Sequence, residues 1–145
     1  MNYHEAKFRS ESIGNKVIVS GQIVKKLFHK QNDRGMTLIE FSSRCVRRGE
    51  IHELVTTTHH SLKPRDLIDK VGFIGFIEIK NPGVIEKNDL VFAGESYVGR
   101  VIGFDECHFP NHYNILIESD QLFCANDFNL RLTEIITFID PIEFK

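Results

Sequence analysis

Short runs rich in Val, Ile and Phe, separated by residues that favour turns, recur along most of this chain. β-branched and aromatic side chains favour extended backbone, so each run is expected to form a strand. The first run covers residues 16–29, KVIVSGQIVKKLFH, and Gly21 in its middle indicates a bulge or a bend. Many short strands at fairly regular spacing are typical of a sandwich or a barrel rather than of a helical bundle. The pattern therefore predicts an all-β protein.

Turn residues divide the rest of the sequence into further strands and one helix. Residues 126–139 place apolar side chains at both the strand period and the helix period, and the Ile-Ile-Thr-Phe sequence within them favours a strand. Residues 61–72 predict one short helix, because Pro64 suits a first helical position and Gly72 suits its end. The remaining strands are expected over residues 36–47, 51–58, 71–80, 89–93, 97–104 and 113–119, the first two forming an antiparallel group with residues 16–29.

Closing such a sheet on itself would remove its exposed edges, which are sites of aggregation. We therefore expect a small antiparallel β-barrel of about seven or eight short strands with one short helix. A chain of 145 residues has the size of one domain, so residues 1–145 are predicted to form a single β-barrel domain. Gly72, Gly75, Gly99 and Gly103 lie within strand-like runs, where a missing side chain permits a bend or the close approach of another backbone.

The apolar runs and the cysteines indicate the compartment. No run approaches the roughly 20 apolar residues that a membrane-spanning helix needs, and the polar first residues offer no secretory signal. Cys45, Cys107 and Cys124 are odd in number and form no C-x-x-C pair, which is typical of reduced thiols. We therefore expect a cytoplasmic protein without disulfides and without a membrane partner.

The charges are unevenly distributed along the chain. Residues 1–50 contain ten Lys and Arg against five Asp and Glu, whereas residues 51–145 contain eight against fifteen. This asymmetry is compatible with a basic face for an anionic ligand, with complementary surfaces in a homo-oligomer, and with charges scattered over a solvated surface. Basic residues near Phe28 and Phe41 are also ingredients of a groove for single-stranded nucleic acid. The net charge of −2 and the acidic later part argue against a nucleic-acid partner.

The densest polar stretch of the chain is residues 104–114, between two predicted strands. Two acids, a thiol, two imidazoles and two amides within ten residues exceed what a turn requires, and loops on a rigid scaffold often carry function. We expect this loop to fold inward over an apolar cavity and to bind a small polar or anionic molecule. The predicted ligand-binding residues are Asp105, Glu106, His108, Asn111, His112 and Asn114.

The same loop contains candidate metal ligands. His108 and His112 suit a divalent ion such as zinc or iron, because neutral imidazoles bind both metals and a carboxylate or thiolate can complete the site. Pro110 argues against a helix, on which this spacing would place both imidazoles on one face. The further ligand would come from Asp105, Glu106 or Cys107 in the loop, or from His59 or His60 elsewhere in the sequence.

Three functions from different classes are compatible with these residues. The first is a protein that binds a small polar or anionic ligand through the 104–114 loop. The second is a metal-assisted or acid–base enzyme that uses His108 and His112 with Asp105 or Glu106. The third is an oligomeric interaction module. The sequence alone leaves open whether the chain is an enzyme.

Overall fold

The computed structural model describes residues 2–142, which form mostly β-structure with a single α-helix. The α-helix is α1 (Tyr3–Ile13), and a 3₁₀-helix covers Ala125–Phe128. The strands are β1 (Val19–Lys26), β2 (Lys30–Gln31), β3 (Met36–Thr37), β4 (Ser43–Val46), β5 (Ile51–Thr57), β6 (Leu67–Ile68), β7 (Val71–Asn81), β8 (Gly83–Glu86), β9 (Leu90–Ala93), β10 (Ser96–Asp105), β11 (Asn114–Glu118) and β12 (Ile135–Ile139). The prediction of an all-β protein is confirmed. The ends of the predicted domain, residue 1 and residues 143–145, lie outside the described residues.

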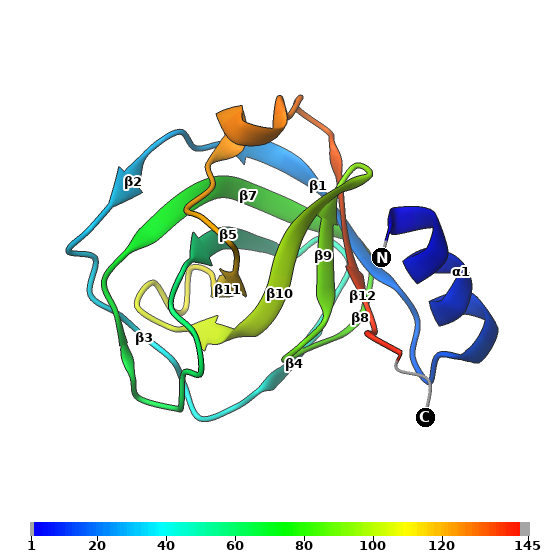
Figure 1. The fold of residues 1–145 in the computed structure, drawn as a ribbon, viewed down its shortest axis with the longest axis horizontal. Coiled ribbons are helices and arrows are strands. Elements are labelled where there is room, and N and C mark those ends of the chain that lie inside the picture. The colour runs from blue at the N-terminus through cyan, green and yellow to red at the C-terminus, as the bar shows by residue number, and fades with distance from the viewer. Residues whose placement is uncertain (1, 143–145) are drawn as a thin grey trace.

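Seven strands in the described range pair in an unbroken cycle (Figure 1). Their order is β1-β12-β9-β10-β11-β5-β7, and β7 pairs again with β1. Strand β2 adds to β7, while β3 with β6 and β4 with β8 form separate two-stranded sheets. The cycle includes one parallel pair, β11 with β5, whereas the sequence pattern predicted an antiparallel arrangement throughout.

Apolar side chains from all seven strands of the cycle meet in one core cluster. Ile77, Phe104 and Phe138 are among its fully buried members. Burying one large apolar side chain contributes about 1.5–3 kcal/mol, so this cluster is the main source of stability for the strand cycle. The cluster also fixes the positions of β5, β10 and β11, the strands that carry the polar loop and its neighbours.

Three shifts in strand register occur at glycines where bends were expected. They fall between Ser20 and Gly21, between Tyr97 and Gly99, and between Val101 and Gly103. Each shift marks a β-bulge or similar irregularity, which bends a strand and increases its twist. These bends let the strands curve round a common centre (Figure 1).

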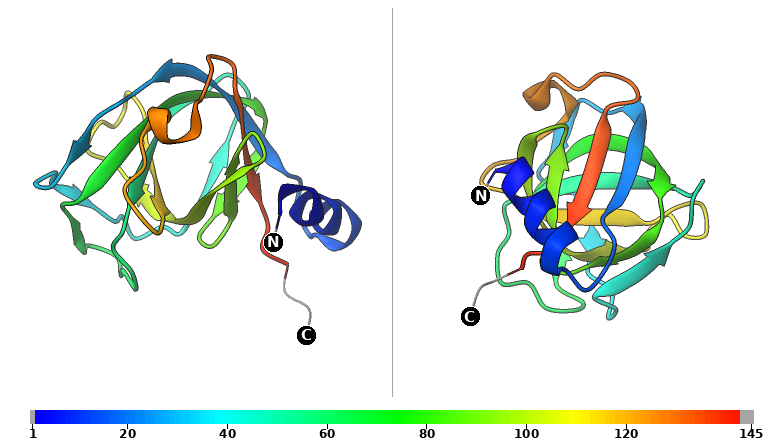
Figure 2. Two further views of the ribbon diagram at one scale, coloured as in Figure 1. Left: turned by 45° about the horizontal axis from the view of Figure 1, so that its top comes forward. Right: turned by 90° about the vertical axis from the view of Figure 1, so that its right-hand side faces the viewer.

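The prediction of a helix over residues 61–72 is wrong. The segment contains turns and the short strand β6, and its backbone is bound elsewhere, since the Arg65 N–H donates to the Leu38 carbonyl at 2.8 Å. The helix forms instead near the start of the chain, where Asn2 Oδ1 accepts from the Glu5 N–H at 2.8 Å and caps α1. Figure 2 shows α1 outside the strands, alongside β12.

Two other predicted elements are divided in the structure. Residues 36–47 form two short strands with different partners, because β3 pairs with β6 and β4 pairs with β8. Only the last part of residues 126–139 is a strand, β12, and the first part includes most of the 3₁₀-helix. The expected antiparallel group at the start of the chain is also wrong, since β1 and β5 pair with opposite edges of β7.

Candidate functional site

A buried carboxylate holds the loop between β10 and β11. Asp105 accepts hydrogen bonds from the backbone N–H groups of Thr37 (2.8 Å) and Cys107 (2.9 Å). It also accepts one from the side-chain amide of Asn114 (2.9 Å). Burial raises the pKa of Asp105, but the Cys107 side chain together with these hydrogen bonds outweighs burial and holds that pKa below its ordinary value. Asp105 is therefore ionised and fixes the two ends of the loop.

The loop directs one imidazole toward β5. Nε2 of His112 lies 3.1 Å from Oε1 of Glu53, and Nδ1 of His112 lies 2.7 Å from Oδ1 of Asn111. An amide oxygen can only accept, so Nδ1 carries the proton and Nε2 presents its lone pair to Glu53. The edge of the imidazole also meets the ring of Phe76, with centroids 4.9 Å apart.

Both members of the Glu53–His112 contact are buried, with side chains 6% and 8% exposed. Burial raises the pKa of Glu53, although the nearby His108 and Arg34 oppose this effect. Burial lowers the pKa of His112, because a buried site disfavours the charged imidazolium. Both shifts favour the neutral forms. Either a carboxyl proton or a bound cation can therefore satisfy the lone pairs that face each other here.

His108 completes a three-residue cluster from the solvent side. Its ring stacks on that of His112 with centroids 4.9 Å apart, and its Nε2 lies 3.0 Å from Nη2 of Arg34. One ligand atom from each of Glu53, His108 and His112 lies within 4.8 Å of the other two. Two imidazoles and one carboxylate are a suitable ligand set for zinc or iron(II).

Asn114 places an unsatisfied oxygen in the same region. The residue is fully buried, and its side-chain amide nitrogen donates to Asp105 Oδ1 and to Cys107 Sγ. Its Oδ1 has no hydrogen-bond partner within residues 2–142. A buried polar atom without a partner costs about 1–3 kcal/mol. A donor group on a ligand would offset that cost.

The structure separates the predicted ligand-binding residues into two groups. His108, His112 and Asn114 lie at the cluster, and the exposed Asn111 orients His112. Asp105 is committed to hydrogen bonds that hold the loop, while Glu106 is exposed on the loop surface.

The acid beside the two imidazoles is Glu53, in place of the predicted Asp105 or Glu106. Cys107, the other predicted ligand, accepts a hydrogen bond from Arg34 at 3.1 Å. Burial and the neighbouring Asp105 raise the pKa of the Cys107 thiol, which favours the protonated form over a metal-binding thiolate.

The second pair of histidines contacts other acids. Nε2 of His59 lies 2.7 Å from Asp69, and Nδ1 of His60 contacts Glu118. Neither histidine belongs to the metal-compatible cluster found in the described part of the chain. The structure therefore gives no support to a third imidazole ligand from this segment.

Sequence reasoning missed Glu53 and Arg34. The parallel pairing of β11 with β5 places Glu53 opposite Asn114, and such a pairing between distant segments cannot be derived from strand patterns alone. Arg34 lies between the strands predicted over residues 16–29 and 36–47, in a segment to which no function was assigned. One signal was available: Glu53 is a single acid inside an apolar strand, and burying a carboxyl group there requires a partner.

A recess of about 290 Å³ adjoins His112 on the side of Arg44 and Tyr113. The Arg44 guanidinium lies over the Tyr113 ring at 3.4 Å from its centroid. The Tyr113 N–H donates to Nδ1 of His52, so Nε2 of His52 carries a proton and donates it to Glu50 at 2.7 Å. These polar walls make the recess suitable for a small polar molecule next to His112.

The fold and the cluster define an all-β protein with a mixed imidazole–carboxylate site. The model of a family described as "Family of unknown function (DUF6917)" matches residues 13–139, and the chain belongs to this family. No curated protein and no solved structure matches the chain. None of the helices in the described residues has the length and apolar character needed to cross a membrane.

Proposed function

We propose that this protein binds one divalent transition metal ion, zinc or iron(II), through Glu53, His108 and His112, and that the bound metal holds a small anionic ligand. The observation that carries the proposal is the approach of three ligand atoms to within 4.8 Å, with Glu53 far from the two histidines in the sequence. Three protein ligands leave coordination positions open, as in sites where a metal binds or activates a small molecule.

The position of Asn111 supports this proposal. Histidine ligands of metals usually donate their second ring N–H to an oxygen, which fixes the orientation of the ring. Oδ1 of Asn111, 2.7 Å from Nδ1 of His112, accepts that hydrogen bond and leaves Nε2 available for coordination. In this proposal Asn111 is a positioning residue rather than a direct contact of the ligand.

Arg34 favours an anionic ligand. Its Nη2 contacts both Nε2 of His108 and Sγ of Cys107. Coordination through Nε2 of His108 would require Arg34 to give up the first of these hydrogen bonds. The guanidinium would then lie beside the metal, where it can bind a carboxylate or phosphate group. The unpaired Oδ1 of Asn114 would accept from a donor group of the same ligand.

We also propose that the cycle of seven strands is a small β-barrel and that it forms a single domain over residues 1–145. The pairing of β1 with both β12 and β7 supports closure, because closure pairs both edges of the sheet.

All three cysteines are free thiols, which supports a reducing compartment such as the cytoplasm.

Metal analysis of the purified protein, followed by titration of the apoprotein with Zn²⁺ and with Fe²⁺, tests the metal site. We expect one metal ion per chain. His112→Ala or Glu53→Gln should weaken binding by at least about 100-fold, because losing a group that only hydrogen-bonds to a metal ligand already costs about 10–100-fold. His59→Ala is the matched control, because His59 also contacts a carboxylate but lies outside the cluster. Wild-type metal affinity in His112→Ala would remove the proposed site.

The Glu53–His112 contact favours a second candidate, an acid–base site without a metal. A proton on Glu53, held 3.1 Å from the Nε2 lone pair, could move to Nε2 of His112 while Nδ1 of the same ring gives its own proton to a ligand in the adjoining recess, which His112 lines. This candidate replaces the first if the apoprotein binds neither ion and infrared spectra show a protonated carboxyl group that Glu53→Gln removes.

A further inference from the structure

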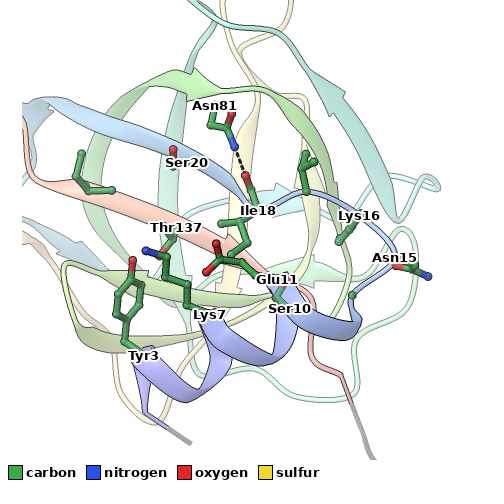
Figure 3. A pocket seen from close by; sticks show the side chains of 13 residues that line it. Tyr3, Lys7, Ser10, Glu11, Asn15, Lys16, Ile18, Ser20, Asn81 and Thr137 are labelled. Carbon is green, nitrogen blue, oxygen red and sulfur yellow. Dashed lines mark hydrogen bonds between the residues drawn. The ribbon is translucent and has the colours of Figure 1, made fainter.

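A groove separates α1 from the outer face of β1 and β12 (Figure 3). Its volume is about 790 Å³, which falls within the range of small-molecule sites. Ser20 and Thr137, which pair across β1 and β12, lie on the strand side, and α1 forms the opposite wall. These elements do not carry the metal-site residues. The family match, over residues 13–139, includes only the last residue of α1.

Two buried hydroxyl groups in this groove lack partners. Ser10 and Thr137 are only 4% and 6% exposed, and both line the groove. Within residues 2–142, neither Oγ of Ser10 nor Oγ1 of Thr137 has a hydrogen-bond partner. Buried hydroxyls are normally hydrogen-bonded, so two unpaired ones in the same groove point to a polar ligand.

Opposite charges on α1 project into the same groove. Lys7 and Glu11 are one helical turn apart, and Figure 3 shows both side chains pointing toward β1 and β12. Neither side chain forms an ion pair or hydrogen bond with any other residue in the described range. Both charges are therefore available to a ligand.

Lys16 is the third charged residue that lines the groove, and its charge is already neutralised by acids of the protein. Nζ of Lys16 lies 2.8 Å from Oδ1 and Oδ2 of Asp89 and 2.9 Å from Glu86. The available charge consists of one cation and one anion, Lys7 and Glu11. A purely anionic ligand would be repelled by Glu11 and a purely cationic one by Lys7, so the groove favours a zwitterion.

Apolar side chains form another part of the lining of the groove. Val17 and Ile135 are 62% and 41% exposed, and Ile18 also lines the groove. An apolar group of a ligand would bury part of this exposed surface, which contributes about 25 cal/mol for each Å² removed from water.

We propose that the groove between α1 and β1/β12 binds an α-amino acid with an apolar side chain. Lys7 binds the carboxylate of the ligand, and Glu11 binds its ammonium group. The hydroxyls of Ser10 and Thr137 complete the hydrogen bonds of these two charged groups. The side chain of the ligand packs on Val17, Ile18 and Ile135. This site is independent of the proposed metal centre.

Calorimetric titration of the full chain with leucine, valine and phenylalanine tests the proposal. We expect saturable binding of at least one of the three. Its N-acetyl derivative, which lacks the ammonium charge, and its amide, which lacks the carboxylate, should each bind about tenfold more weakly, equivalent to one lost charge-assisted hydrogen bond. Absence of binding by all three amino acids, or equal binding of the two derivatives and the parent amino acid, would overturn the proposal.

Thr137→Val separates a binding role from a structural one. Valine has the shape of threonine without the hydroxyl, so the variant should bind the amino acid about tenfold more weakly while its melting temperature stays equal or rises. Glu11→Gln should also weaken binding, whereas Glu5→Gln, on the same helix but outside the groove, should not. Unchanged affinity in both Thr137→Val and Glu11→Gln would show that the ligand binds elsewhere.

Discussion

Asp105 illustrates how a residue with the chemistry of a ligand can instead hold a loop in place. Its two oxygens accept three hydrogen bonds, from Thr37, Cys107 and Asn114. Asp105→Asn would turn an NH₂ group toward one of these donors, so we expect a loss of about 1–3 kcal/mol in the free energy of unfolding at neutral pH. Urea unfolding measures the change, with the exposed Asp33→Asn as the control.

The free energy of unfolding of Asp105→Asn should depend on pH differently from that of the wild type. The pKa of Asp105 in the folded protein lies below its ordinary value of 3.8, so its ionised form stabilises the fold above that pH. This contribution is lost as the pH falls through the lowered pKa of the folded state. The difference in stability between wild type and Asp105→Asn should therefore narrow below pH 4. A constant difference across this range would contradict the assigned role.

The sequence predicted part of the candidate site for a physical reason. The polar density of residues 104–114 exceeds what a turn requires, and this density alone indicates His108 and His112 as candidate site residues. Glu53 could not be found in this way, because its position beside His112 depends on the parallel pairing of β5 with β11. The alternation of apolar and polar residues in a strand indicates which side chains face the core, but it does not indicate which strands lie on either side.

At the scale of elements, the strands were more predictable than the helix. Residues 61–72 contain Pro64 and Gly72 at helix-like positions, but hydrogen bonds to the chain after β3 determine their structure. Helix α1 lacks an apolar periodicity and was missed, although Asn2 followed by Glu5 is a typical start signal. The bends at Gly99 and Gly103 were predictable, because a glycine inside a strand usually marks a bulge, a bend or the close approach of another backbone.

Gly99 provides a prediction for the bend in β10. A Cβ atom at this position would lie 2.0 Å from the carbonyl oxygen of Glu118, a backbone atom that cannot move without disturbing β11. We expect Gly99→Ala to lower the free energy of unfolding by at least about 2 kcal/mol. At Gly35 a Cβ would meet nothing within 4 Å, so Gly35→Ala should leave stability unchanged or slightly raised. Equal urea midpoints for the two variants would disprove this account.

At the scale of the whole molecule, some charges of the basic first part and the acidic later part neutralise each other within one chain. Lys16 pairs with Asp89, and Lys30 pairs with Asp127, so basic residues from the first part contact acids from the second. These ion pairs weaken the argument that the asymmetry exists for self-association. The predicted homo-oligomer stays a prediction, and sedimentation at low and high salt would test it.

The Lys16–Asp89 pair also links the segment after α1 to the strand cycle. We therefore expect this pair to contribute to the stability of the entire fold. The side chains are 11% and 2% exposed, so Lys16→Met leaves a buried carboxylate without its cation. Removing one partner of a buried pair costs about 3–5 kcal/mol. We expect a loss of this size in the free energy of unfolding at neutral pH. Lys30→Met is the control, because Lys30 and Asp127 are 43% and 34% exposed and should contribute little.

The pH dependence of Lys16→Met identifies the cause of its instability. Burial already raises the pKa of Asp89 above its ordinary value of 3.8, against the opposing effect of Lys16. Without that lysine the pKa should rise further, so the folded variant binds a proton more tightly than the unfolded chain does. Its free energy of unfolding should then increase, relative to that of wild type, as the pH falls toward 4. A deficit that stays constant on acidification would mean that lost packing of the lysine side chain, and not an unpaired carboxylate, destabilises the variant.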